Sequence, residues 1–102
     1  MRPIYLAQLD KVRPVLILTR DIVRPFLTWV TVAPITTTAR GMSTEIPVGK
    51  ANGLDTDSVV SCDNVTTVPV TTLGRQIGIL LPEQEPLLTQ ALLAAFDLEG
   101  TM

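Results

Sequence analysis

The chain has 102 residues, 46% of them hydrophobic and 18% charged, which predicts one compact domain over residues 1–102 and excludes a disordered chain. With no histidine and one cysteine, Cys62, it has no internal disulfide, no Ser-His or Cys-His nucleophile pair and no Cys/His metal site, so we expect no cofactor. The net charge is −2, but residues 1–50 carry +4 and residues 51–102 carry −6, which is typical of a polyanion-binding face or of a solvated surface.

The longest run of Val, Leu and Ile covers only residues 15–18, and the first residues do not resemble a secretory signal. We therefore expect no membrane insertion and a cytoplasmic protein.

The body of the chain is expected to be β-structure, because Val, Ile and Thr supply 32 of its residues. Turns are predicted at Asn52-Gly53, at Arg40-Gly41 and at Gly74. In chain order, the predicted strands are Ile4–Leu9, Pro14–Arg20, Thr28–Thr36, Thr44–Val48, Ser58–Asp63, a short one near Val68–Thr71, and Arg75–Leu80.

One helix is predicted at the end of the chain, over Pro86–Leu98, with Leu88, Leu92 and Ala95 on its apolar face and Gly100 as its stop. Residues 82–85 are expected to form a lead-in turn, since Pro86 does not fit a helix interior. Short strands followed by one helix predict a mainly β fold, an SH3-like small barrel whose open end is covered by the C-terminal α-helix.

Two segments place polar groups beside apolar strands. Arg13 immediately precedes a strand that is apolar on both faces, and the segment around Ala33 runs into three hydroxyls, Thr36, Thr37 and Thr38. Taken separately, Arg13 fits a side chain that reaches solvent from a strand end, and the threonines fit a turn cap.

The order and spacing of three motifs resemble the MazF/PemK family of bacterial toxin endoribonucleases. The motifs are Arg13-Pro14-Val15-Leu16, Ala33-Pro34-Ile35-Thr36 and Asp57-Ser58-Val59-Val60, and the closing block Leu73–Gly78 is also similar. The chain departs from the family at Leu9–Val12, where a short connection replaces the family's usual long loop, at Pro3, where a glycine is usual, and at Thr66, where an arginine is common.

The resemblance implies metal-independent RNA cleavage with Arg13 and Thr36 as the catalytic pair. Attack by a ribose 2′-hydroxyl needs no external nucleophile, so a chain without histidine can perform it by positioning the phosphate and stabilising its added charge. We expect single-stranded RNA, whether messenger, ribosomal or transfer RNA, to contact these further residues: Thr37, Thr38, Arg20, Arg24, Arg40, Ser58, Asp63 and Asn64.

Several of these residues also fit plain structural roles. Asp63 and Asn64 match family positions near bound nucleotides, but they fit a strand-end turn as well. Trp29 and Phe26 are suited to stacking on bases or to packing in the core or a dimer. Cys62 is expected to be a small buried hydrophobic residue.

The resemblance implies two protein partners, an acidic MazE-like antitoxin and a second copy in a homodimer built around Val30–Pro34 and the C-terminal region. Two rival functions remain. One is a gyrase poison related to CcdB, although the C-terminal Trp-Gly-Ile of those toxins is absent because the chain ends Glu99-Gly100-Thr101-Met102. The other is a non-catalytic SH3-like binding module.

Overall fold

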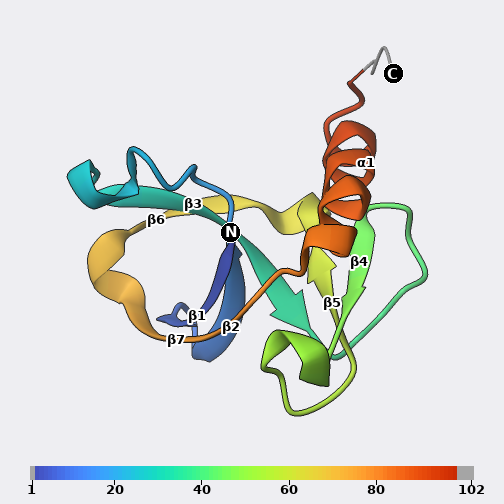
Figure 1. The fold of residues 1–102 in the computed structure, drawn as a ribbon, viewed down its shortest axis with the longest axis horizontal. Helices are drawn as coiled ribbons and strands as arrows, with labels where there is room; N and C mark the ends of the chain where they lie inside the picture. Colours follow the sequence, from blue (N-terminus) through green and yellow to red (C-terminus); the bar gives the residue numbers. More distant parts are fainter. Residues whose placement is uncertain (1, 99–102) are drawn as a thin grey trace.

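A computed structural model describes residues 2–98. The fold is a strongly bent antiparallel sheet with one α-helix standing beside it, so the predicted small barrel-like fold is confirmed (Figure 1). The strands are β1 (Pro3–Gln8), β2 (Val12–Ile17), β3 (Trp29–Thr36), β4 (Glu45–Val48), β5 (Ser58–Ser61), β6 (Thr66–Pro69) and β7 (Leu73–Ile79), and the helix is α1 (Glu85–Ala95).

The strands run in the order β4-β5-β3-β2-β1-β7. Strand β6 lies outside this path and pairs with the first half of β3, while β5 pairs with its second half. β3 is therefore the central strand of the fold. It is hydrogen-bonded to β2 on one side and to β5 and β6 on the other.

The core has two parts, and β2 and β3 contribute to both. Leu16 and Ala33 belong to the cluster that α1 covers, whereas Ile17 and Val32 belong to a second cluster on the other face of the same strands. Successive side chains of a strand point to opposite faces, so a strand buried on both faces must be apolar throughout. This explains the unbroken apolar run that follows Arg13.

The C-terminal helix matches the predicted helix in type and face. Leu88 and Ala91 are buried, and Leu92 and Ala95 pack against the same cluster. A short 3-10 turn, Pro82–Gln84, leads into it, as predicted. The helix ends three residues earlier than predicted because Asp97 takes a left-handed conformation (φ 53°), which lets the N–H of Leu98 donate to the carbonyl of Leu93. The predicted stop, Gly100, lies outside the described residues.

Three sequence predictions about turns and strand ends need correction. Gly74 lies inside β7, and the reversal before it is a 3-10 turn at Val70–Thr72. The strand predicted over Ser58–Asp63 stops at Ser61 and continues as a 3-10 turn, Cys62–Asn64. Gly53 takes a positive φ of 87°, as the turn predicted at Asn52-Gly53 requires. Gly41 has a positive φ of 69° as well, but the turn of its loop lies further along the chain, at Ser43-Thr44.

Trp29 and Phe26 do not pack in the core, because both side chains are exposed. Cys62 is buried, as predicted. Among residues 2–98, no helix is both long enough and apolar enough to cross a membrane.

Candidate active site

The predicted catalytic pair lies at one end of the β2–β3 hairpin. Val15 pairs with Pro34, and continuing this register by two residues brings Thr36 opposite Arg13. Arg13 and Thr36 therefore lie on the same face of the two strands. Both line a cavity of about 490 Å³, which we call the Arg13 pocket.

The Arg13 guanidinium is held by a carboxylate that the sequence analysis did not single out. Nε of Arg13 donates to Oδ1 of Asp10 at 2.9 Å, and Nη2 donates to Oδ2 at 3.0 Å. This two-pronged pairing uses one edge of the guanidinium and leaves its other N–H groups available to an anion.

The short connection between β1 and β2 creates this contact. It is a three-residue turn in which Leu9 N–H donates to the carbonyl of Lys11, and Lys11 N–H donates to Oδ1 of Asp10. Asp10 thus stands at the tip of the hairpin, directly beside the first residues of β2. A carboxylate three residues before an arginine, across so tight a turn, was the signal available in the sequence.

The ion pair shifts the pKa values of both groups, in opposite directions. The hydrogen bond from Arg13, supported by Lys11 N–H, lowers the pKa of Asp10 to about 2. The same hydrogen bond raises the pKa of Arg13 above its usual value. At neutral pH, Asp10 is therefore an anion and Arg13 a cation.

The hydroxyl of Thr36 is prepared by its own loop. Its Oγ1 accepts a hydrogen bond from the backbone N–H of Thr38 at 3.2 Å. Since a hydroxyl has one proton to donate, the O–H of Thr36 remains free to donate into the pocket.

Asp63 and Asn64 reach the pocket because of a mismatch between strands. Ile35 pairs with Val60, but Val32 pairs with Thr66, so residues 61–65 span the stretch opposite only residues 33 and 34. The surplus residues loop out as the 3-10 turn. This turn places Asp63 and Asn64 on the pocket rim.

Hydrogen bonds fix both of these side chains. Thr44 Oγ1 donates to Oδ2 of Asp63 at 2.6 Å, and Nδ2 of Asn64 donates to Oγ of Ser61 at 2.8 Å. The free carboxylate oxygen of Asp63 and the carbonyl oxygen of Asn64 remain able to accept hydrogen bonds.

Four of the eight predicted RNA-binding residues line the Arg13 pocket, namely Thr38, Arg40, Asp63 and Asn64. Thr37 and Ser58 line a separate hollow beside Arg75. Thr37 faces away from the Arg13 pocket because successive residues after β3 alternate: Thr38 and Arg40 line the pocket, whereas Thr37 and Ala39 line a neighbouring hollow.

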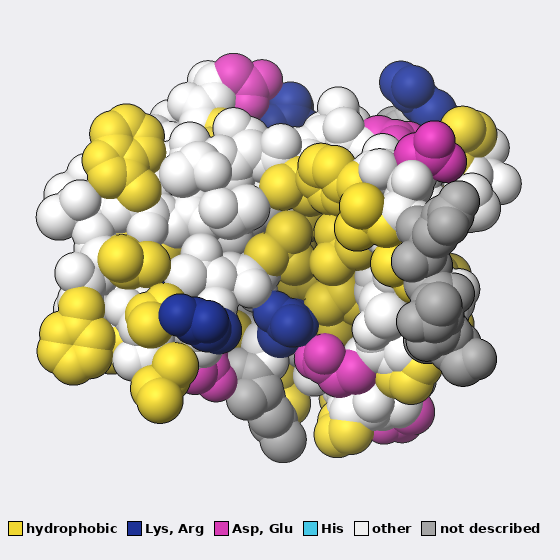
Figure 2. Space-filling model, turned by 90° about the horizontal axis from the view of Figure 1, so that it is seen from above, with side chains coloured by type: hydrophobic (Ala, Val, Ile, Leu, Met, Phe, Trp, Pro, Cys, Tyr) yellow, Lys and Arg dark blue, Asp and Glu magenta, His cyan; other side chains and the backbone are white. Residues whose placement is uncertain are grey.

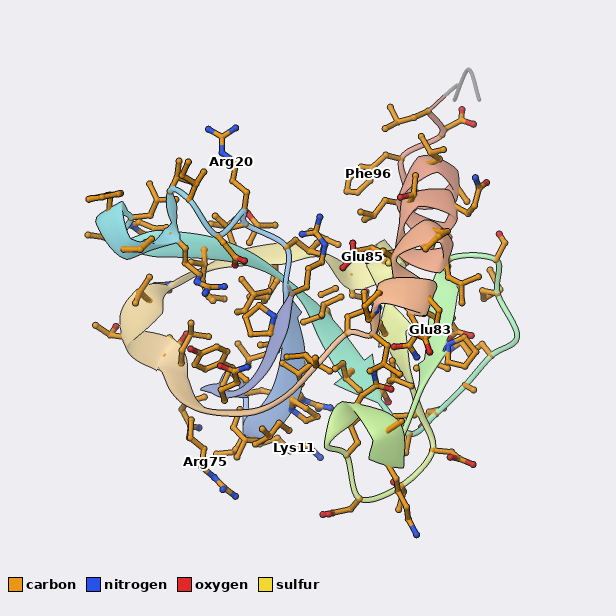
Figure 3. All side chains as sticks on the ribbon, in the orientation of Figure 1. Lys11, Arg20, Arg75, Glu83, Glu85 and Phe96 are labelled. Carbon is orange, nitrogen blue, oxygen red and sulfur yellow. The ribbon has the colours of Figure 1, made fainter. Side chains whose placement is uncertain are left out.

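Arg20 and Arg24 do not reach the Arg13 pocket. They belong to the connection between β2 and β3, which lies at the opposite end of the hairpin from Arg13 and Thr36. Figure 3 shows Arg20 on the far side of the molecule from Lys11, a residue of the β1–β2 turn. Arg24 forms an ion pair with Asp21 at 2.9 Å, and Arg20 lines a hollow with Arg2 and Glu85.

The described residues offer no evident metal centre. Within the part of the chain that the structure covers, no three His, Cys, Asp or Glu side chains come together in a group that suits a metal ion.

The chain is similar to known proteins over nearly its whole length. A family model described as PemK-like, MazF-like toxin of type II toxin-antitoxin system matches residues 3–96. The chain is 68% identical over 99 residues to endoribonuclease MazF3 of Mycobacterium tuberculosis, an alignment that covers 97% of this chain and 96% of the relative.

Two solved structures extend the comparison. The M. tuberculosis toxin MazF-mt6 superposes with a TM-score of 0.96 at 67% identity, covering 97% of this chain and all of that one. A mycobacterial endoribonuclease in complex with its cognate antitoxin has a TM-score of 0.85 at 25% identity, covering 96% of this chain and 94% of that one.

Proposed function

The chain belongs to the PemK-like, MazF-like toxins of type II toxin-antitoxin systems, and we propose that its Arg13 pocket is where it cleaves RNA. It is an endoribonuclease, as its similarity to MazF3 over nearly the whole of both chains establishes. The observation that carries the proposed site is that Arg13, whose guanidinium is held by Asp10, and Thr36 line one cavity.

The reaction is a transesterification within the RNA. The ribose 2′-hydroxyl gives up its proton to solvent water and its oxygen forms a bond to the adjacent phosphorus, while the bond from phosphorus to the 5′-oxygen breaks and the 5′-oxygen takes up a proton. The products are a 2′,3′-cyclic phosphate and a 5′-hydroxyl. Because the nucleophile belongs to the RNA, the protein's task is to hold the phosphate and to stabilise the charge that builds up on it.

Arg13 and Thr36 supply that stabilisation. The N–H groups of Arg13 that Asp10 does not occupy bind the phosphate oxygens, and the Thr36 hydroxyl orients the phosphate by donating to it. An arginine is a poor base at neutral pH, so we assign Arg13 to charge stabilisation and to protonation of the leaving 5′-oxygen. Asp10 is a positioning residue that keeps the guanidinium aimed.

The pocket rim selects how the RNA enters. Arg40 offers a cation for a neighbouring phosphate, while Asp63 and Asn64 offer acceptors for the edges of unpaired bases. The substrate is therefore single-stranded RNA, in messenger RNA or in an open region of ribosomal or transfer RNA. We also propose that the protein acts in the cytoplasm, where these RNA molecules are found.

The test is cleavage of a short RNA and of the same RNA with one 2′-deoxy sugar 5′ to the scissile phosphate. Intact RNA should yield cyclic phosphate and 5′-hydroxyl ends in the presence of EDTA, and the deoxy substrate should resist. Arg13→Ala should lower kcat/KM by about 10²–10³, as expected when one preorganised donor is lost. Arg13→Lys should recover only part of this loss, because it keeps the charge without the fork.

Thr36→Val should also lower the rate while the protein stays folded. Arg75→Ala is the matched control, since it removes an exposed arginine that does not line the Arg13 pocket. Cleavage of the deoxy substrate, or full activity of folded Arg13→Ala, would overturn the mechanism.

We further propose that an acidic antitoxin, disordered in part before binding, competes with RNA for this pocket. A carboxylate-rich peptide can pair with Arg13 and Arg40 in place of phosphates, and such binding weakens as salt rises. A relative whose structure was solved with its cognate antitoxin supports this kind of partner. An antitoxin complex that is insensitive to salt, or that leaves RNA cleavage unaffected, would count against competition.

We also propose a two-fold homodimer. Figure 2 shows hydrophobic side chains gathered in a hollow on one face of the molecule. Val30, Val32 and Ala33 are already buried within their own chain, so the predicted contribution of Val30–Pro34 needs correction. Exposed apolar residues that could form the interface include Ile22, Phe26, Leu27, Trp29, Phe96 and Leu98. Sedimentation that shows a monomer at micromolar concentration would defeat the dimer.

A further inference from the structure

The loop between β3 and β4, residues 37–44, forms a wall of the Arg13 pocket. Its residues alternate, so that Thr38, Arg40 and Met42 line the pocket while Thr37 and Ala39 line a neighbouring hollow. The loop thus carries the rim cation Arg40 without belonging to any strand.

One carboxylate holds this loop in place. Glu45, the first residue of β4, accepts the backbone N–H of Arg40 at 3.0 Å and the backbone N–H of Met42 at 3.1 Å, both on Oε1. Oε2 also accepts from Arg40 N–H, at 3.3 Å. The N–H of Glu45 in turn donates to the carbonyl of Met42 at 3.1 Å.

The two N–H groups that Glu45 binds belong to the residues whose side chains face the pocket. Within residues 2–98, nothing else accepts a hydrogen bond from either of them. Hydrogen bonds to a charged group are stronger than those between neutral groups, so losing this carboxylate frees the middle of the loop.

The position of Glu45 is otherwise hard to explain in a site for a polyanion. Its side chain lines the same pocket as Arg13 and Thr36, where a carboxylate repels an incoming phosphate. The repulsion is tolerated if the carboxylate has another task, and the hydrogen bonds to the loop supply one.

We propose that Glu45 is a positioning residue for the RNA reaction, holding the 37–44 loop so that Arg40 faces the RNA beside Arg13 and Thr36. This rests on the proposed function of the Arg13 pocket. Within residues 2–98, Glu45 forms no hydrogen bond or ion pair with either of the catalytic side chains, whose positions are set by β2 and β3. Its effect should therefore fall on RNA binding more than on the chemical step.

The kinetic test uses Glu45→Gln, which keeps the size of the side chain and one acceptor oxygen but removes the negative charge, so that the hydrogen bonds from the N–H groups of Arg40 and Met42 become weaker. We expect KM for a single-stranded RNA to rise about tenfold, with kcat changed by less than about threefold. Arg40→Ala should raise KM by a similar factor. The double variant Arg40→Ala/Glu45→Gln should be no more than about twofold worse than Arg40→Ala alone, because residues that act as one unit are not additive.

The matched control is Glu83→Gln, which removes an exposed carboxylate away from the pocket. It should leave KM and kcat unchanged. A Glu45→Gln variant with wild-type or lower KM, or one whose effect adds in full to that of Arg40→Ala, would overturn the proposal.

Amide hydrogen exchange gives a readout that does not depend on cleavage. In Glu45→Gln, the N–H groups of Arg40 and Met42 should exchange at least about tenfold faster, while those of Val15 and Leu16 keep wild-type rates. Unchanged exchange at Arg40 and Met42 would refute the role of Glu45 even in an active enzyme. Failure of the wild-type protein to cut RNA would instead refute the function proposed for the pocket.

Discussion

Replacing Gly78 by alanine should destabilise the fold strongly, because β7 and the turn after β4 touch backbone to backbone at this point. A methyl group on Gly78 would lie 2.6 Å from the carbonyl carbon of Asn52 and 3.2 Å from Cα of Gly53. Carbon atoms in good contact are about 3.5–4.0 Å apart, so the two segments would have to separate by about 1 Å.

That separation also pulls on a buried amide. Asn52, 2% exposed, donates from Nδ2 to the carbonyl of Ile79 at 2.9 Å and to Oε1 of Gln84 at 2.7 Å. Overpacking costs about 1–3 kcal/mol, and a buried polar group that loses its partner costs about 1–3 kcal/mol more. We expect Gly78→Ala to lower the free energy of unfolding by about 3–5 kcal/mol, out of a total of about 5–15 kcal/mol.

The assay is urea unfolding followed by far-UV circular dichroism, together with the melting temperature, which should fall by roughly 15 °C or more. Gly74→Ala is the control in the same strand. Its methyl group would lie 3.3 Å from the carbonyl oxygen of Leu6, a contact that costs about 1 kcal/mol or less. A Gly78→Ala protein within about 1 kcal/mol of Gly74→Ala would refute this account of the contact.

Three further outcomes follow from the site and the core. In an NMR titration, the Asp10 carboxyl should titrate at about pH 2 in the wild type and at about pH 4 in Arg13→Ala. The stabilisation from this ion pair is therefore present above about pH 4 and is lost as the pH falls toward 2, and a wild-type midpoint near pH 4 would contradict it. Burial raises the pKa of Cys62 to about 11, so the folded protein should resist a disulfide reagent at pH 8, and prompt labelling of the folded protein would count against this. The free energy of unfolding should decline above about pH 8.5, because the thiol ionises there only in the unfolded chain. Thr44→Val removes the 2.6 Å hydrogen bond to Asp63 and should weaken RNA binding, measured by fluorescence anisotropy, and lower the free energy of unfolding by about 1–2 kcal/mol, measured by thermal melting. Unchanged RNA binding would show that the orientation of Asp63 does not matter.

Local patterns were enough to predict the elements. The β-branched runs predicted every strand to within a few residues, and the spacing of Leu88, Leu92 and Ala95 predicted the buried face of the helix. These features depend on side-chain periodicity, which the sequence displays directly. Arg13 and Thr36 were predicted as a pair from the resemblance of their motifs to the family. The register of β2 and β3 explains why these two residues lie opposite each other.

The remaining features depend on contacts between distant segments. The turn that carries Asp63 follows from the unequal registers of β5 and β6 on β3, which no single segment reveals. The roles of Asp10 and Glu45 depend on loop geometry. Arg20 and Arg24 were grouped with the site because they share its basic half of the chain, but a hairpin has two ends, and they lie at the other one.

The pairing of β1 with β7 bears on how this toxin comes into being during synthesis. Pro3 lies opposite Ile79, so one of the first residues made must wait for one of the later ones before the sheet can close. Pairings that join such distant parts of a chain fold slowly, on a scale of about milliseconds to seconds. All the residues that we assign to catalysis precede residue 65, yet a nascent chain that ends there lacks both β7 and the helix that covers the core. We therefore expect the ribosome making this ribonuclease to be exposed to its activity only after the nearly complete chain has been released.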